Sequence, residues 1–412
     1  MVSHLLASPI RSRARGRACI LRQNDWYEPM VQREAEALSG AGFEVEVLCM
    51  RGAEGGRRTL VNGVTVIYLP VRRPKASKLG KALAYGRFFL SATTYLSLQH
   101  LRRPYTVIQA NSMPDFLVFS ALVPKLMGCR VVAKLQEPTP ELAATIFGRT
   151  WLTGLLARIE QSAIRFADHT VTVTDQLKQR YVERGATANC ITVVLNCVDP
   201  ATLLENWSPP ASESTSEFVA VCHGSIEDRY GQDTIIAAAC LLRSEMPDLR
   251  FVVTGRGSQA GAIRDSIAEH GLREIVRFEG WVSQVRLNDI LHSADVGIVA
   301  QKASPYSHLV HTNKMMDYWI FGLPVIATRL EAVSGYYDDH VIEYFEPGDA
   351  ASLATAIRRL RTDPGRRKEL IENGKYAQIR NGWTAQRLSY LGVFESITIS
   401  RPRESQKLLS LT

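Results

Sequence analysis

Residues 305–328 of this 412-residue chain read PYSHLVHTNKMMDYWIFGLPVIAT, a polar loop that becomes a short helix and then, past Gly322 and Pro324, an apolar strand. The unpaired amides and the positive dipole end of a first helical turn favour an anion such as phosphate. Lys314 adds a cation there, and Asp317 follows one turn later, where a carboxylate can accept hydrogen bonds from hydroxyls. The segment therefore indicates a nucleotide-sugar site; the alternative is an ordinary helix-to-strand connection.

Short β-branched apolar runs alternate with helical patterns along the whole chain, which is typical of βαβ units. Predicted strands of a first series lie at 17–22, 43–50, 64–70, 106–111, 130–135, 169–174 and 191–196. A second series lies at 218–224, 250–255, 276–281, 295–300, 323–328 and 341–347. Amphipathic helices are predicted at 31–38 and 349–360, and a packed helix at 383–394. The pattern indicates an α/β protein of two doubly wound domains, with ligands bound at the carboxyl ends of the strands.

The domain boundaries follow from composition, since the stretch 208–217, SPPASESTSE, has the polar character of a linker. We predict a disordered basic arm at 1–16, a first domain at 17–207, the linker at 208–217, a second domain at 218–380 and a carboxyl-terminal helix at 381–400 that packs back on the first domain.

Charge is concentrated in the first domain. Residues 1–110 hold 17 Lys and Arg against 7 Asp and Glu, whereas the whole chain has a formal net charge of +8. Within it, residues 72–103 interleave cations with apolar side chains, as does a helix that lies on an anionic membrane surface; a solvated basic helix face is the alternative. No compact nucleic-acid-binding motif accompanies the charge, so nucleic acid is not expected as a partner.

Cysteine usage and apolar runs indicate the compartment. The seven cysteines form no C-x-x-C pair and lie mostly in apolar runs, so we interpret them as reduced core residues and expect no zinc site. The nearly uncharged run 88–101 is shorter than the ~20 residues of a membrane span, and the start of the chain lacks the order of a secretory signal. We expect a cytoplasmic protein, peripheral at the inner face of the membrane.

The motif in 305–328 resembles the donor half of the retaining GT-B glycosyltransferases of family 4, in which a polar loop, a lysine, an acidic residue and G-x-P-V precede a strand. The matching residues are Asn313, Lys314, Asp317, Gly322, Pro324 and Val325. The resemblance covers about residues 17–395. It implies two Rossmann-like domains that face each other across a cleft.

A second motif, HGSIEDRYGQD at 223–233, is similar to the family's Gly-x-x-x-x-Arg-Lys-Gly diphosphate loop, with Gly224, Ser225 and Arg229. Tyr230 replaces the family's second cation, so Lys314 is expected to share the diphosphate with Arg229. By the same resemblance, the remaining donor-binding residues are Gly255, Arg256, Gly280, Trp281, Val282, His311, Thr312, Asn313 and Asp317. Asp317 is expected to bind the ribose hydroxyls, and the Gly-Arg-Gly spacing does not fit a dinucleotide fingerprint.

Two family positions are replaced. The first of the family's two acidic residues, eight positions apart, maps to Leu309, and the histidine of its first domain maps to Gln136, which can hydrogen-bond but cannot titrate. His308 and His311 lie near Leu309 as sugar contacts or surface residues, and the surface reading is favoured for His308.

The first domain is expected to bind the acceptor. The segment RQNDWYEPMVQREAEAL resembles R-x-x-x-D-x-R-x-x-x-E-A of polysaccharide glycosyltransferases; helix capping and salt bridges are the alternative roles. The candidates there and after the following strands are Arg22, Asn24, Asp25, Arg33, Asn111, Met113, Pro114, Asp115, Gln136, Glu137, Pro140 and Glu141.

The resemblance implies a retaining, metal-independent glycosyltransferase of hexosyltransferase type. It would move a sugar from a nucleotide diphosphate-sugar, with no further cofactor, to a glycan or polyprenyl-diphosphate-linked acceptor in bacterial surface polysaccharide biosynthesis. The expected catalytic residues are Arg229, Lys314, Asp317 and Gln136, the cations stabilising the leaving diphosphate. Two alternatives stay open: a sugar-nucleotide epimerase or hydrolase on the same fold, and a non-catalytic nucleotide-sugar or glycan-binding partner in a membrane assembly.

Overall fold

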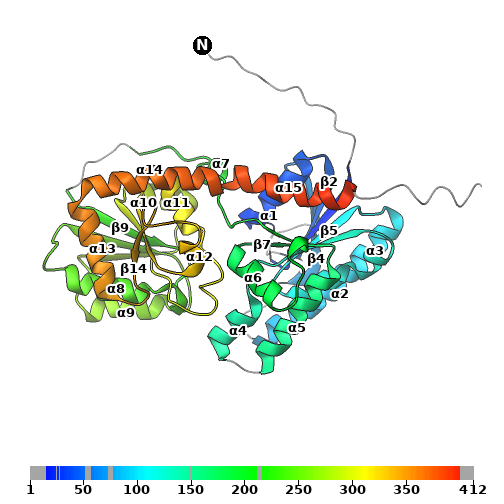
Figure 1. Cartoon of the computed structure of the whole chain (residues 1–412), viewed down its shortest axis with the longest axis horizontal. Helices are drawn as coiled ribbons and strands as arrows, with labels where there is room; N and C mark the ends of the chain where they lie inside the picture. Colours follow the sequence, from blue (N-terminus) through cyan, green and yellow to red (C-terminus); the bar gives the residue numbers. More distant parts are fainter. Residues whose placement is uncertain are drawn as a thin grey trace, which may run out of the picture. The chain divides into compact units, whose positions relative to one another are not determined.

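The computed structural model describes residues 15–24, 26, 28–51, 57–72, 78–148, 151–210 and 216–399. The chain forms two compact α/β units, each built on a largely parallel sheet, which confirms the predicted fold class of two Rossmann-like domains (Figure 1). Unit 1 holds the chain up to Val173, Leu177–Val194 and the chain from Arg387 on. Unit 2 holds Thr174–Gln176 and Leu195–Gln386.

Unit 1 has an eight-stranded sheet in the order β3-β4-β2-β1-β5-β6-β7-β8, parallel except for the antiparallel pair β3 and β4. Its strands are β1 Gly16–Leu21, β2 Phe43–Arg51, β3 Arg58–Val61, β4 Val64–Arg72, β5 Val107–Asn111, β6 Arg130–Lys134, β7 His169–Thr172 and β8 Ile191–Val193. All seven strands predicted for this half are present. The sequence analysis missed β3, which is largely exposed and so lacks an apolar alternation.

The helices of unit 1 cover both faces of its sheet. Right-handed crossovers put α1 on one face and α2 to α5 on the other, because the strand order reverses between β1 and β5. The carboxyl-terminal α15 lies on the face of α1, since the side chain of Gln109 bonds both Glu34 of α1 and Tyr390 of α15. The helices are α1 Pro29–Gly40, α2 Lys78–Arg102, a 3-10 helix Asp115–Ala121, α3 Leu122–Leu126, α4 Thr139–Phe147, α5 Trp151–Phe166, α6 Asp175–Glu183, a 3-10 helix Ala188–Cys190 and α15 Trp383–Ile399.

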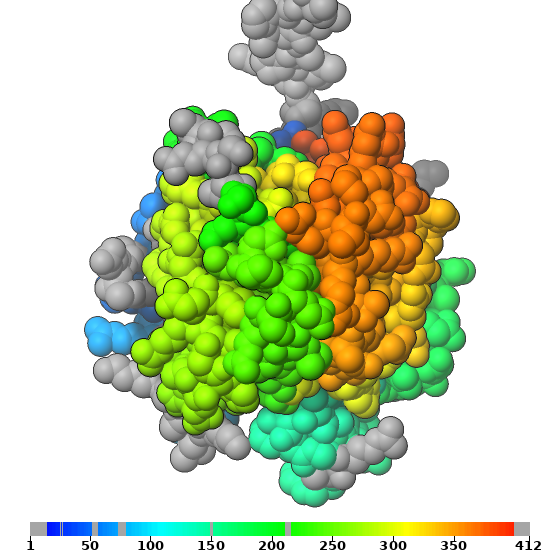
Figure 2. Space-filling view, turned by 90° about the vertical axis from the view of Figure 1, so that its left-hand side faces the viewer, coloured from blue at the N-terminus to red at the C-terminus, as the bar shows by residue number. Residues whose placement is uncertain are grey.

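Unit 2 has a six-stranded parallel sheet in the order β11-β10-β9-β12-β13-β14. Its strands are β9 Phe218–His223, β10 Leu249–Thr254, β11 Val276–Gly280, β12 Val296–Val299, β13 Val325–Thr328 and β14 Glu343–Phe345. Its helices are α7 Pro200–Leu203, a 3-10 helix Asp228–Tyr230, α8 Gln232–Leu242, α9 Ala260–Glu269, α10 Gln284–His292, α11 Lys314–Ile320, α12 Glu331–Ser334, α13 Ala350–Thr362 and α14 Pro364–Asn381. Figure 2 shows α8 (green) packed beside α13 and α14 (orange) on the outside of this unit.

The boundary between the units lies at Val194 and Leu195, earlier than the predicted end of the first domain at 207. The reason is local packing: Trp207 donates from its indole Nε1 to Asp289 at 2.9 Å, and its ring lies 5.3 Å from that of Phe321. At the other end, α15 joins unit 1 from Arg387, and the hydroxyl of Tyr390 donates to Gln109 at 2.8 Å.

Three further expectations concern the amino terminus, the cysteines and the membrane. The arm assigned to 1–16 lies outside the described residues up to residue 14, and β1 begins at Gly16. All seven cysteines are free thiols and five are buried, whereas Cys190 is exposed and Cys240 is half-buried, so the core assignment does not hold for those two. Among the helices that the structure describes, none has the length and apolar character to span a membrane.

Candidate functional site

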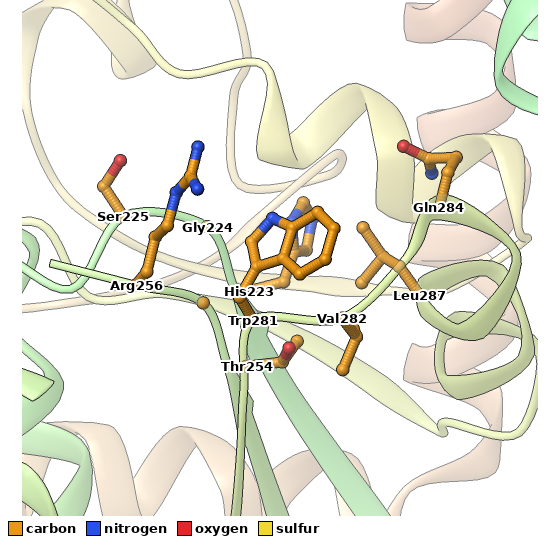
Figure 3. Close-up of a pocket in the computed structure, with 10 residues that line it drawn as sticks. His223, Gly224, Ser225, Thr254, Arg256, Trp281, Val282, Gln284 and Leu287 are labelled. Atoms are coloured by element: carbon orange, nitrogen blue, oxygen red, sulfur yellow. The ribbon is translucent and has the colours of Figure 1, made fainter. Parts of the chain in front are cut away.

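A cavity of about 390 Å³ opens in unit 2 where β9, β10 and β11 end. It is lined by His223, Gly224, Ser225, Thr254, Gly255, Arg256, Trp281, Val282, Gln284 and Leu287 (Figure 3). Six of these residues were predicted donor-binding residues, and they converge from three separate loops. The carboxyl end of a parallel sheet is where α/β domains bind ligands, so this cavity is the candidate site.

Two glycines let the loops after β9 and β10 close on each other. Gly224 and Gly255 have φ angles of +109° and +145°, which disfavour any residue with a side chain. A Cβ on Gly255 would lie 1.7 Å from the carbonyl oxygen of Gly224. The Gly-Arg-Gly segment is therefore required by the packing of the two loops, and this packing shapes one wall of the cavity.

Trp281 forms an open wall of the cavity. Its side chain is 66 % exposed, and it follows Gly280, whose φ of +68° turns the chain at the end of β11. The guanidinium carbon of Arg256 lies 5.8 Å from the centroid of the indole ring. In the view of Figure 3, Trp281 lies between Arg256 on one side and Leu287 on the other. An exposed indole of this kind offers a planar apolar face to an aromatic ligand.

Lys314 adjoins the cavity at Gly224. It is the first residue of α11, and a Cβ on Gly224 would lie 2.7 Å from its Cε, so its side chain runs directly over the glycine. The residue is 9 % exposed, and burial lowers the pKa of its ammonium group. Its Nζ lies 4.3 Å from the centroid of the Tyr230 ring. The carboxylate of Asp317, three residues along α11, attracts this ammonium group and offsets part of the effect of burial.

Tyr230 holds two cations at once. The guanidinium carbon of Arg229 lies 4.8 Å from the same ring centroid that Lys314 approaches. The position at which the related family carries a cation is therefore occupied by an aromatic ring that attracts cations through its π face. Arg229 and Lys314 are brought together, as the sequence analysis predicted, and the buried Nε of Arg229 has no hydrogen-bond partner.

Asp317 lies beside His223, the last residue of β9. Their Oδ2 and Nε2 atoms are 3.4 Å apart. Burial, with a smaller effect from Lys314, lowers the pKa of His223 to about 3, so its ring is neutral and the contact is not an ion pair. The ring also packs edge-on against Tyr318, 5.2 Å between centroids. His223 therefore connects the cavity wall with the carboxylate that the sequence analysis assigned to the ribose.

The loop before α11 contains two more buried polar atoms without a partner, Nε2 of His311 and Oδ1 of Asn313. His311 is 4 % exposed, and burial lowers its pKa to about 4. Thr312 accepts a hydrogen bond from the amide of Lys314 at 3.3 Å. His308, by contrast, is one-third exposed, and Leu309 is buried and offers no acidic group.

Several unpaired buried polar atoms of unit 2 lie near the start of α11. Nε2 of His223 and Nε of Arg229 are also buried without a hydrogen-bond partner. Each unpaired buried polar atom costs about 1–3 kcal/mol, and native proteins carry few of them. A polar ligand at this place would satisfy several of them together.

In unit 1, two predicted acceptor residues are engaged within the fold. Arg22 forms two hydrogen bonds of 2.6 Å with Glu28 and another with the carbonyl of Ser112. Glu141 pairs with Arg184. These contacts favour the salt-bridge role that the sequence analysis left open for Arg22, and they show that Glu141 takes part in an ion pair within unit 1.

Other polar groups of unit 1 are better placed for a ligand. Gln136, Asn111 and Gln23 follow or end the neighbouring strands β6, β5 and β1, and each carries a buried atom without a partner. Asp115 is 5 % exposed, and burial raises its pKa to about 7. Asp25 lies outside the described residues. The remaining candidates lie after β1, β5 and β6 or on α1 and α4: Asn24, Arg33, Met113, Pro114, Glu137 and Pro140.

Sequence reasoning missed a buried ion pair between Glu34 of α1 and Lys134 of β6, whose side chains are 1 % and 3 % exposed. Gln109 donates to Glu34 at 2.7 Å and accepts from Tyr390. The sequence does contain a sign of this ion pair, because Glu34 is a charged residue among the apolar positions of α1. Gln284 and Leu287 were also missed, since nothing in the pattern of α10 shows which of its residues face a cavity, and so was Thr254 at the end of β10. Among the described residues, no group of three or more His, Cys, Asp or Glu side chains is placed to hold a metal ion.

Comparison with known proteins gives consistent results in both halves. Residues 27–197 match the model "Glycosyl transferase 4-like domain", and residues 217–363 match "Glycosyl transferases group 1". A 2-deoxystreptamine N-acetyl-D-glucosaminyltransferase of Niallia circulans is 22 % identical over 80 % of this chain and 86 % of its own length. The lipopolysaccharide core biosynthesis glycosyltransferase LpsD of Rhizobium meliloti is 31 % identical over 38 % of this chain and 43 % of its own.

Solved structures share the fold. Sucrose-phosphate synthase from Thermosynechococcus elongatus superposes with a TM-score of 0.74 at 18 % identity, covering 94 % of this chain and 100 % of its own. HepE from Anabaena, solved in complex with UDP-glucose, gives 0.70 at 16 % identity, with 92 % and 99 % covered. The chain therefore belongs to the group 1 glycosyltransferases, with a glycosyl transferase 4-like domain in its first half.

Proposed function

We propose that unit 2 binds a nucleotide diphosphate-sugar and that the enzyme transfers the sugar to a glycan or to a lipid-linked acceptor. The observation that carries this proposal is the junction at Gly224. There a cavity of about 390 Å³ meets the side chain of Lys314, whose pKa burial lowers even though the carboxylate of Asp317 is near. Buried cations are costly unless an anion is close, and a diphosphate supplies that anion.

The donor's orientation follows from the chemistry of the walls. The nucleoside base lies against the exposed face of Trp281, and the diphosphate lies towards Lys314 and Arg229. The ribose hydroxyls bind Asp317, whose carboxylate can accept two hydrogen bonds from a vicinal diol. HepE, a similar protein in fold, was solved with UDP-glucose, which makes uridine the first base to test. The deoxystreptamine enzyme adds the N-acetylglucosaminyl group as a sugar to test.

We propose a retaining transfer on one face of the sugar. The bond between the anomeric carbon and the β-phosphate oxygen breaks, and the electron pair stays on the diphosphate, whose charge Lys314 and Arg229 stabilise. The acceptor hydroxyl attacks the anomeric carbon from the same face and gives its proton to the departing phosphate oxygen. The two cations do the work of a divalent ion in this scheme. Gln136 of unit 1 can hydrogen-bond but cannot titrate, so the scheme assigns it no proton transfer.

The setting that we propose is bacterial surface polysaccharide or glycolipid biosynthesis at the cytoplasmic membrane face, with a polyprenyl-diphosphate-linked or other lipid-linked acceptor. Support comes from relatives named for lipopolysaccharide core biosynthesis and as a phosphatidyl-myo-inositol mannosyltransferase. The basic character of the first 110 residues is consistent with an anionic surface nearby.

The test of the donor site is thermal unfolding with a panel of nucleoside diphosphates and their sugars, followed by product analysis. A ligand at 100 times its Kd should raise the free energy of unfolding by about 2.7 kcal/mol. Transfer with retention predicts an α-linked product from an α-linked donor. An enzyme that binds the donor without releasing or transferring its sugar would support the non-catalytic alternative. A changed sugar on the recovered nucleotide would support the epimerase.

A further inference from the structure

The exposed large apolar side chains of the described residues concentrate on one layer of unit 1. This layer consists of α2, α3, α4, α5 and the 3-10 helix Asp115–Ala121 on one face of the sheet (Figure 1). Helix α2 contacts α3 and the 3-10 helix, α5 contacts the 3-10 helix, and α4 contacts α5. Its exposed apolar residues are Leu83, Leu90, Leu98, Leu101, Leu122, Leu126, Met127, Ile146, Phe147, Trp151 and Leu155. Concentrations of this kind mark a surface that another molecule covers.

Helix α2 packs on unit 1 through a separate buried face, so its exposed leucines are not part of the core. One face of the helix is buried at a spacing of four residues: Ala84, Phe88, Ala92, Leu96 and His100. The opposite face carries a leucine stripe, which we define as Leu83, Leu90, Leu98 and Leu101, with exposures of 60, 64, 49 and 62 %. The buried face alone fixes the helix on unit 1, so the stripe is free to contact something else.

The charge around the leucine stripe selects an anionic partner. Residues 72–103 contain eight Lys and Arg and no Asp or Glu. Lys81, Arg87 and Arg102 are exposed beside the stripe. A second copy of this chain, docked through the same face in a symmetric dimer, would bring these like charges together. An anionic lipid surface instead pairs with every one of them, at about 1 kcal/mol per cation.

The end of α4 and the start of α5 provide a second group of exposed apolar side chains. Trp151, at the start of α5, is 80 % exposed, and Ile146 and Phe147, at the end of α4, are 56 and 48 % exposed. Tryptophan is enriched at the membrane–water interface because its ring is apolar and its N–H is polar. Since α5 and α2 both pack on the 3-10 helix Asp115–Ala121, the two apolar groups belong to the same layer.

We propose that this layer docks on an anionic phospholipid bilayer, with the leucine stripe of α2 and the side chains of Ile146, Phe147 and Trp151 at the acyl boundary and the flanking cations among the headgroups. No described helix is suited to span the membrane, so α2 lies along the interface. The inference deepens the proposed function, because it rests on an acceptor that is held in the membrane and assigns the surface that reaches it.

The test is co-sedimentation of the full chain with vesicles of phosphatidylcholine alone and of phosphatidylcholine mixed with phosphatidylglycerol. Binding to the mixed vesicles is expected, with little binding to the neutral ones. The double variant Leu90→Glu with Leu98→Glu should weaken binding by at least about ten-fold. Arg87→Gln should weaken it by about five-fold, an effect that high salt removes. The matched control is Ile379→Glu, an apolar residue of α14 in unit 2 that is 60 % exposed and should bind as the unsubstituted chain does.

Two further measurements keep the outcomes distinct. Sedimentation velocity without lipid tests self-association; an oligomer that the double variant dissociates, with no vesicle binding by the unsubstituted chain, would overturn the proposal in favour of a dimer interface. Equal binding of the double variant and the control to mixed vesicles would overturn it as well. Titration with UDP tests the donor site separately, and the double variant should bind UDP like the unsubstituted chain. Failure of the donor site is thus separable from failure of the membrane surface.

Discussion

Replacing Lys314 by methionine should make the protein no less stable and at the same time weaken its binding of nucleoside diphosphates. Both effects have one cause. The ammonium group is buried at 9 % exposure, with Nζ over the Tyr230 ring at 4.3 Å and burial lowering its pKa. Methionine keeps an unbranched apolar side chain that is one atom shorter, and it removes the charge that the folded protein must bury.

The magnitudes follow from the surroundings. Exchanging buried charges for apolar residues of similar volume often leaves the free energy of unfolding unchanged or raises it, by about 1–4 kcal/mol for paired charges. For Lys314→Met we expect the free energy of unfolding to rise by between zero and about 1 kcal/mol. A hydrogen bond to a charged group contributes about 1.5–3 kcal/mol, which corresponds to a Kd about 10- to 150-fold higher once the diphosphate loses this contact. Binding of the nucleoside without phosphates should not change.

The assay combines urea unfolding without ligand and calorimetric titration with UDP and with uridine. Uridine is the internal control, since it occupies the same cavity without reaching the lysine. A variant that loses more than about 1 kcal/mol of stability and still binds UDP as tightly as the unsubstituted protein would refute the reasoning. Lys314 would then be a structural residue of α11.

Four other substitutions test separate parts of the account. Gly224→Ala should destabilise the protein and weaken UDP binding, because its φ is +109° and the new Cβ would meet Cε of the lysine at 2.7 Å; differential scanning calorimetry and titration check this. His223→Phe should raise the KM for the donor by about ten-fold, whereas His223→Gln, which keeps a polar side chain at this wall of the cavity, should restore it, in steady-state kinetics. His311→Gln should flatten the pH dependence of unfolding. Its pKa is about 4 in the folded protein and ordinarily 6.5, so the unfolded chain binds the extra proton between these values. The histidine's contribution is complete above pH 6.5 and falls by about 1.4 kcal/mol per unit as the pH drops, which urea unfolding at pH 7 and pH 5 measures. Glu34→Leu should cost about 3–5 kcal/mol by leaving Lys134 buried without its carboxylate, and adding Lys134→Met should recover most of that loss in urea unfolding.

The strand series and both parallel sheets could be predicted from sequence because buried parallel strands read as short β-branched apolar runs. β3 could not, since exposed residues such as Leu60 carry no pattern. The boundary between the two units at Val194 could not be predicted either, because it is set by the tertiary contact of Trp207 with Asp289. The three-dimensional packing of distant residues leaves no periodic trace in the chain.

The donor-site candidates could be predicted where glycine spacing and a helix start mark a loop, as at Gly224 and Lys314. What the sequence could not show is which groups share one environment. In the sequence, Tyr230 stands where a second cation was expected. In the structure, its ring lies next to both Arg229 and Lys314. Arg22 looked available for an acceptor, but its partner Glu28 lies six residues away along a loop whose conformation only the structure gives.

Hydrogen exchange with and without UDP is the measurement that tests the donor site most directly. The account predicts slower exchange in the loops after β9 and β10, at 224–226 and 255–257, and around the start of α11. The amides after β1, β5 and β6 of unit 1 should be unaffected by UDP alone. Protection confined to unit 1, or none anywhere at saturating concentrations of UDP, GDP, ADP and dTDP, would contradict the claim that the cavity of unit 2 holds the nucleotide.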